Sequence, residues 1–272
     1  MPATKDGFQF TEGDRSDLEL LYFVYQLRLA TIDHLAELAG RSYTRVHKRI
    51  AKLHEHGYLA CIERRPEKHA YAIGSAAIPV LIEHGHAPRE LAEKRLRHNE
   101  RKELGIRHAL FVASIHAKLM LLTRTGPVRI VNWVEGPSLK DRVKTLDENG
   151  AAIVIPVYPD VWFTIQHAEL PEGKNKFNFF IEADRGSMSH ERMRAKVRGF
   201  IAYFQQGLHT KKYGIKLFKV ATICETKGRA TELANTFRGM MEPAWSRAYP
   251  VTGLEDLTLE ALMPEILQTG QV

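Results

Sequence analysis

Residues 153–204 constrain the fold of this chain more than any other stretch. They contain two runs rich in β-branched and aromatic residues, 153–166 and 177–184, separated by a polar segment at 169–175. Apolar runs on either side of a polar turn indicate adjacent strands joined by a loop. Apolar residues at helical spacing follow, up to Phe204. The stretch therefore predicts two neighbouring strands and a helix packed beside them.

Three carboxylates accompany these predicted strands. Asp160 follows Pro159 at the head of the first strand, and Glu182 and Asp184 lie near the end of the second. Because side chains alternate along a strand, Glu182 and Asp184 point to the same face. Carboxylates on apolar strands are costly to bury without compensation, and a divalent metal ion is the usual compensation. The alternative is that these strand-end carboxylates are solvated or cap the next helix.

The helix after Asp184 carries Lys196 on the flank of its apolar face, placed to reach back towards the carboxylates. An Asp, then Glu-x-Asp, then a helix with a lysine resembles the PD-(D/E)xK nuclease core. The sequence departs from that pattern because Asp184 stands at the position that lysine usually holds. Lys196 is the candidate for the displaced cation and Arg185 is a second. A lysine that lies along the edge of the core with its ammonium in water is the alternative for Lys196.

Composition limits the class of protein. The formal net charge of +7 and the isoelectric point of about 9.3 favour a polyanionic partner, with nucleic acid ahead of a membrane surface. The two cysteines, Cys61 and Cys224, are expected to be free, buried thiols in a reducing compartment. The N-terminus lacks the apolar core of a signal peptide. His116 and Lys118 interrupt the longest apolar stretch, so we expect no membrane span and a cytoplasmic location.

The first 75 residues have the pattern of a helix-turn-helix. One amphipathic helix covers residues 17–29, a second begins after Thr31 and ends at Gly40, and a third begins after Ser42 and ends at Gly57. The third helix has a buried stripe of Val46, Ile50 and Leu53. Two short strands joined near residues 65–68 follow it and resemble the wing of a winged helix.

A basic stripe on the third helix lies away from its apolar stripe, as a DNA recognition helix requires. The residues predicted to contact double-stranded DNA are Tyr43, Thr44, Arg45, Lys48, Arg49 and Lys52 on the helix and Arg64, Arg65 and Lys68 at the hairpin tip. A merely solvated face, or a winged helix that binds protein, is the alternative. Three segments are expected: a winged-helix domain at 1–75, a charged helical connector at 76–105, and a second domain at 106–272.

The second domain reads as a helix, several strands, a helix, a strand at 213–224 and a helix capped by Thr226, which predicts an α/β sandwich within an overall α+β chain. Behind a winged helix, the sequence has Pro159-Asp160, then Glu182 to Ser187, and then Lys196 and Tyr203. In this combined pattern the sequence resembles the replication-relaxation family. The segment that enters the first helix at His108 is similar as well. The resemblance implies a restriction-endonuclease-like fold in a bacterial plasmid or mobile-element protein that acts on DNA in replication or transfer. In that family Glu-x-Asp-Arg-Gly is the usual form.

The resemblance implies a metal-dependent DNA nickase or relaxase associated with the nucleoid or a plasmid. Asp160 and Glu182 would hold Mg²⁺ or Mn²⁺, Asp184 would be a third ligand or orient water, and Lys196 would offset charge. Tyr158 and Tyr203 are open as nucleophiles, although a tyrosine at the flank of a core more often packs. A non-catalytic DNA-binding regulator is the alternative function, and a transcription repressor leaves the carboxylates unexplained. A homodimer and contacts with other replication or transfer proteins remain open.

Overall fold

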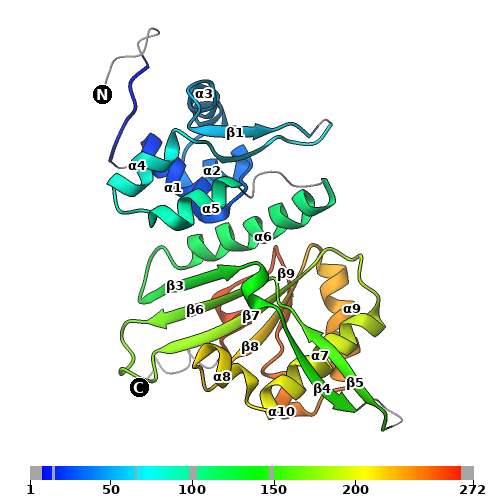
Figure 1. Ribbon diagram of the computed structural model, residues 1–272. Helices are drawn as coiled ribbons and strands as arrows, with labels where there is room; N and C mark the ends of the chain where they lie inside the picture. The colour runs from blue at the N-terminus through cyan, green and yellow to red at the C-terminus, as the bar shows by residue number, and fades with distance from the viewer. Residues whose placement is uncertain (1–7, 14–15, 65, 98–102, 147–149, 265–272) are drawn as a thin grey trace. The chain divides into compact units, whose positions relative to one another are not determined.

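The structure, a computed structural model, is a mixed α/β fold in two compact units, Met1–Ala117 and Lys118–Val272 (Figure 1). It describes residues 8–13, 16–64, 66–97, 103–146 and 150–264. The predicted mixture of helices and strands is confirmed. The first unit includes α5 and most of α6, and the second contains the strands near the three carboxylates.

Three helices begin the first unit: α1 (Asp17–Leu27), α2 (Ile32–Ala39) and α3 (Tyr43–Glu55). Thr31 caps α2, since its hydroxyl accepts from the His34 backbone N–H while the Thr31 N–H donates to His34 Nδ1. Gly40 ends α2 in the left-handed conformation. The predicted boundaries between these helices are therefore set by local capping.

A hairpin follows α3, and it consists of β1 (Leu59–Ile62) and β2 (Ala70–Ile73). Ala30, between α1 and α2, forms an antiparallel bridge with Tyr71 of β2, with N–H to carbonyl distances of 2.9 and 2.8 Å. Val46, Ile50 and Leu53 of α3 are fully buried, as their spacing predicts. The bridge and the buried stripe fix α3 beside the hairpin.

The rest of the first unit is helical, with α4 (Ala77–Glu83), α5 (Arg89–Arg97) and α6 (Glu103–Leu122). Ile106 and Leu110 of α6 pack against β2 and Leu29 in one apolar cluster. The 18-residue stretch Gly105–Leu122 is long and apolar enough to cross a membrane by length and composition alone. Half of that stretch is buried inside the protein, and the core helices of soluble proteins can have the same length and composition.

The second unit is built on a five-stranded mixed sheet in the order β3-β6-β7-β8-β9 (Figure 1). Its strands are β3 (Val128–Glu135), β6 (Val161–His167), β7 (Lys176–Asp184), β8 (Lys219–Cys224) and β9 (Val251–Gly253). The first three are antiparallel neighbours, whereas β8 runs parallel to β7 and β9 parallel to β8. A helix therefore crosses over between β7 and β8, and it carries Lys196.

The run at 153–166, expected as one strand, is two strands in different sheets. Its first part is β5 (Ala152–Val157), which pairs with β4 (Asp141–Leu146) in a separate hairpin, and its second part is β6. The break falls at residues 158–160, where Pro159 has no N–H to donate to a ladder. Asp160 thus sits at the turn between two sheets. The first strand of this hairpin, β4, is absent from the sequence-based prediction.

The helices of the second unit are α7 (His190–Gln205), α8 (Leu208–Tyr213), α9 (Lys227–Arg238), α10 (Pro243–Ser246) and α11 (Leu259–Leu262), with a short 3-10 turn at Pro137–Leu139. Residues 213–224 were expected to form one strand, but α8 ends at Tyr213 and β8 begins only at Lys219. Thr226 caps α9 as predicted, because its hydroxyl accepts from the Arg229 N–H.

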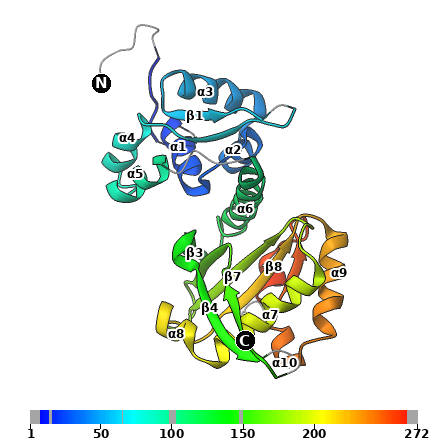
Figure 2. The same cartoon turned by 45° about the vertical axis from the view of Figure 1, so that its right-hand side comes forward.

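The core of the second unit places α7 between the β4–β5 hairpin and the sheet (Figure 2). Val143 and Ile155 of the hairpin share one cluster with Val197 of α7 and Phe180 of β7. Gly199 permits the close approach, since a Cβ there would lie 2.8 Å from Cγ2 of Ile155. This packing fixes the face of α7 that points at β7.

Candidate functional site

Asp160 is held against β7 by two hydrogen bonds. Its backbone N–H donates to the Ile181 carbonyl at 2.9 Å, and its Oδ2 accepts from the Ala183 N–H at 2.8 Å. The side chain is half-buried. The turn that separates the two sheets therefore delivers one carboxylate to the carboxyl end of β7.

Glu182 and Asp184 lie two residues apart on β7, and their exposed fractions are only 4% and 5%. Ala183 between them is less buried, as alternation along the strand requires. Phe180, the preceding residue on that face, packs against α7. Both carboxylates consequently face the helical layer and need compensation for their lost hydration.

Lys196 of α7 compensates Glu182, because its ammonium forms an ion pair with Glu182 Oε2. Burial would lower the pKa of Lys196, but attraction to Glu182, and then to Asp160 and Asp184, outweighs burial and raises it. The ammonium thus stays charged and lies in the field of all three carboxylates. The structure brings together the four residues that the sequence proposed for this site.

Arg229 of α9 compensates Asp184 and was missed by sequence reasoning. Its Nε donates to Asp184 Oδ2 at 2.7 Å, and its other nitrogens reach His190 Nε2 at 3.1 Å and the Met188 carbonyl. Burial would lower the pKa of Arg229, but the hydrogen bond to Asp184 and the attraction to its charge together outweigh burial and raise it. The one available signal is a cation in the first turn of a helix, where the helix dipole disfavours it.

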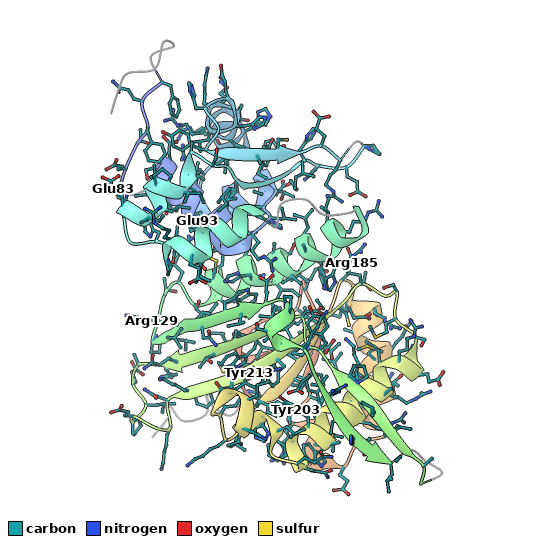
Figure 3. All side chains as sticks on the ribbon, viewed as in Figure 1. Glu83, Glu93, Arg129, Arg185, Tyr203 and Tyr213 are labelled. Carbon is teal, nitrogen blue, oxygen red and sulfur yellow. The ribbon has the colours of Figure 1, made fainter. Side chains whose placement is uncertain are left out.

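Arg185, the second cation proposed for the site, turns to a different partner. Its Nε lies 3.7 Å from a carboxylate oxygen of Glu225, which is half exposed (Figure 3 labels Arg185). Tyr203 is also committed, since its buried hydroxyl donates to Asp141 Oδ2 at 2.7 Å (Figure 3). Burial and this hydrogen bond raise the pKa of Tyr203. Tyr158, in contrast, is 40% exposed beside Asp160.

The donor atoms at this site suit a hard divalent cation with few protein ligands. Glu182 supplies a carboxylate from β7 and Asp160 supplies one from the turn just before β6, the strand that pairs with β7, whereas Asp184 forms an ion pair with Arg229. Within the described ranges, no group of three or more His, Cys, Asp or Glu is placed to hold a metal ion. Mg²⁺ commonly binds through one or two carboxylates, keeps several waters and adds substrate phosphates. Two carboxylates fit that mode of binding.

The N-terminal half of α3 forms an exposed polar and basic face. Tyr43, Thr44, Arg45 and Lys48 are all exposed, and the Tyr43 ring stacks on His47 with centroids 6.0 Å apart. No acidic partner of Arg45 or Lys48 lies within the part of the chain that the structure describes. These two cations are therefore available to an external anion.

Arg49, from the same basic stripe, faces inward. Its guanidinium forms an ion pair with Asp17, whose side chain is 1% exposed, and donates to the Gln9 carbonyl. The Phe8 ring lies 4.8 Å from the guanidinium carbon. The hydrogen bond with Asp17 raises the pKa of Arg49. Arg49 thus ties the N-terminal segment to α1 and α3.

The cations predicted at the hairpin tip and the end of α3 also have acidic partners. Lys52 contacts Glu55 at 2.8 Å, and Lys68 contacts Asp33 at 2.8 Å. Arg64 is buried and pairs with Glu67. Arg65 lies outside the described residues. Of the cysteines, Cys224 is a buried free thiol as expected, whereas the free thiol of Cys61 is half-buried.

These features define a two-unit α/β protein that joins a basic helical unit to a carboxylate–lysine site. The chain belongs to the replication-relaxation family, whose model matches residues 21–217, more than half of the sequence. The match includes Asp160, Glu182, Asp184 and Lys196, and it ends before Arg229. Family membership indicates a role in replication or mobile-element processes. Comparison with curated proteins and with solved structures gives no significant match.

Proposed function

We propose that the protein binds double-stranded DNA through the exposed N-terminal half of α3. The first unit would then be a winged helix-turn-helix, with α3 as the recognition helix and β1–β2 as the wing. Three observations support this assignment: the order of helices and hairpin, the bridge between Ala30 and Tyr71, and the exposure of Arg45 and Lys48. Cations of this kind contact phosphates, while Tyr43 and Thr44 can reach base edges.

We further propose that the second unit is restriction-endonuclease-like and cleaves a phosphodiester bond in a metal-dependent reaction. The contact of Lys196 with Glu182, in the field of Asp160, carries this proposal. Asp160 and Glu182 would hold Mg²⁺ or Mn²⁺, which when bound lowers the pKa of a water and offsets phosphate charge. A reaction of this kind suits the nicking of DNA at a replication or transfer origin.

The residues of the chain have separable roles in this proposal. Lys196 remains a cation because its pKa is raised, so it can hold a phosphate oxygen in the transition state but cannot act as a base. Asp160 stays oriented by the Ala183 N–H. Asp184 with Arg229 fixes the end of β7 to α9 and takes no part in holding the metal ion. Tyr203 is excluded as an exposed nucleophile by its burial.

A supercoiled-plasmid assay with Mg²⁺ or Mn²⁺ tests cleavage. Wild type should convert supercoiled plasmid to the nicked form, while Glu182→Gln, Asp160→Asn and Lys196→Met should each lose at least about 100-fold in rate. Lys174→Met, at an exposed position in the turn before β7, is the control and should nick as wild type. Equal nicking by Glu182→Gln and wild type would exclude this site.

A non-catalytic DNA-binding regulator is the second candidate function. It is favoured by the pairing of both buried carboxylates with protein cations, Glu182 with Lys196 and Asp184 with Arg229. In that case the second unit would bind a second copy of the chain or another replication or transfer protein. If the protein binds DNA but nicks it with no divalent metal ion tested, the regulator function is selected. Such a regulator would act in the bacterial cytoplasm, at the nucleoid or a plasmid.

A further inference from the structure

The β4–β5 hairpin has one buried face and one exposed face. Val143, Ile155 and Val157 face α7 and are buried. The alternate positions point the other way and are exposed, and we call them the outer face. The outer face consists of Lys140, Arg142, Lys144 and Leu146 on the β4 side and Ala152, Val154, Pro156 and Tyr158 on the β5 side.

The outer face is cationic and apolar at once. Its three charged side chains are all basic, and none pairs with an acidic side chain in the described part of the chain. Arg142 lies opposite Pro156 and Lys144 opposite Val154, so each cation stands beside an exposed apolar residue. Asp141, the acidic residue of β4, belongs to the other alternation and contacts Tyr203 and Lys212. This composition suits a ligand with anionic groups spaced along an apolar or aromatic body.

Tyr158 places this face beside the candidate cleavage site. The ring is 40% exposed, and the ammonium of Lys140 lies 5.0 Å from its centroid. Tyr158 precedes Asp160 by two residues, so their Cα atoms are at most about 7 Å apart. An aromatic ring with a cation on it, at the edge of a basic stripe, is the arrangement on which nucleic-acid bases stack.

We propose that the outer face binds an unpaired DNA strand and presents it to Asp160 and Glu182. Tyr158 stacks on a base while Lys140, Arg142 and Lys144 contact successive phosphates. The stripe is two β-strands wide, about 5 Å from strand to strand, which matches one extended nucleic-acid backbone rather than a duplex. The inference rests on the proposed cleavage activity for its purpose, but it concerns a binding surface that is measured separately. It is distinct from the duplex-binding face on α3.

Fluorescence anisotropy of the full chain with a labelled oligo-dT of about 16 nucleotides tests this proposal. Tyr158→Ala should weaken binding roughly tenfold, whereas Tyr158→Phe, which keeps the ring, should bind as wild type. Lys140→Ala/Arg142→Ala/Lys144→Ala should lower the salt-dependence slope by about 2, since each phosphate contact on a single strand contributes about 0.7. Lys174→Ala/Lys176→Ala/Lys216→Ala removes the same charge from other exposed positions and should leave the slope near that of wild type.

The outcomes separate this inference from the proposed function. Weaker oligo-dT binding with unchanged duplex binding supports the outer face whether or not the plasmid is nicked. Equal loss in the hairpin triple and its control would mean that only overall charge matters, which overturns the inference. Unchanged oligo-dT binding in Tyr158→Ala overturns it as well, even if wild type nicks plasmid. If the outer face instead binds another protein, and Tyr158→Ala abolishes that binding, the ligand is a protein and the proposed DNA strand is overturned.

Discussion

The cations of the two units are arranged in opposite ways. On α3 of the first unit, Arg45 and Lys48 point to solvent, whereas Lys196 and Arg229 of the second unit point inward at Glu182 and Asp184. In the sequence, all four cations look alike, because each lies on a helix at a position that spacing does not mark as facing solvent or the core. A carboxylate on another element makes the difference, because it converts a surface cation into an internal counterion. Arg49 shows both sides of this rule, since it belongs to the α3 stripe yet pairs with Asp17.

The largest expected effect comes from removing an inward cation. Arg229→Met should lower the free energy of unfolding by about 3–5 kcal/mol, because it leaves Asp184 buried without its counterion. Urea unfolding measures the change. Arg185→Met is the matched control, since Arg185 pairs with a half-exposed glutamate, and it should cost less than about 1 kcal/mol. Equal costs for the two variants would mean that burial does not distinguish these ion pairs.

Acidification should weaken the first unit through His34. Burial lowers the pKa of His34 to about 4, with Asp33 opposing and Lys68 reinforcing this shift. The unfolded chain takes up a proton near pH 6.5, so stability is full above pH 6.5 and falls by about 3 kcal/mol as the pH drops to 4. His34→Gln keeps a residue suited to the capping position and should flatten this part of the stability profile. A profile identical to that of wild type would exclude His34 as the cause.

Arg49 and its exposed neighbours should separate stability from DNA binding. Arg49→Met should cost about 2 kcal/mol of unfolding free energy, less than Arg229→Met because Thr11 still donates to Asp17. Its salt-dependence slope for duplex DNA should not change. Arg45→Ala/Lys48→Ala should leave stability within about 0.5 kcal/mol but lower that slope by about 2. If Arg49→Met lowered the slope while Arg45→Ala/Lys48→Ala lowered the stability, Arg49 would be the DNA contact and the other two would be structural.

The smallest expected effect concerns Gly199 in α7. Gly199→Ala should lower the free energy of unfolding by about 1–2 kcal/mol, because the clash with Ile155 outweighs the gain of about 1 kcal/mol in helix propensity. Thermal unfolding measures it. The control compares Ile155→Ala with Gly199→Ala/Ile155→Ala, because neither variant has the Cγ2 atom of Ile155 that the new Cβ would meet, so Gly199→Ala should not destabilise in that background. A stabilised Gly199→Ala protein would show that the hairpin can move away from α7.

Much of the first unit could be predicted because its signals are local. Thr31, Gly40 and Gly57 mark helix ends, and Val46, Ile50 and Leu53 mark the buried face of α3. The second unit was harder because composition does not show where a strand changes sheet. Residues 153–166 form one apolar run, and only Pro159 hints that β5 and β6 belong to different sheets.

The candidate site could be predicted in part for the same reason. Glu182, Asp184 and Lys196 lie within 15 residues of one another, so alternation on a strand and spacing on the next helix place them together. Arg229 lies 45 residues beyond Asp184, and nothing in its surroundings points to that partner. The exposed fraction of Tyr158 and the buried hydroxyl of Tyr203 were equally beyond reach, since both depend on the β4–β5 hairpin.

The position of Arg229 also decides how short a working piece of this protein can be. The family match ends at residue 217, which invites truncation at that point. Such a fragment would lose β8, the parallel neighbour of β7, together with the guanidinium that neutralises Asp184. It would keep every residue of the proposed cleavage site and still lack the support that holds two of them in place. The shortest useful truncation therefore retains α9, which carries Arg229, and β9, which pairs with β8.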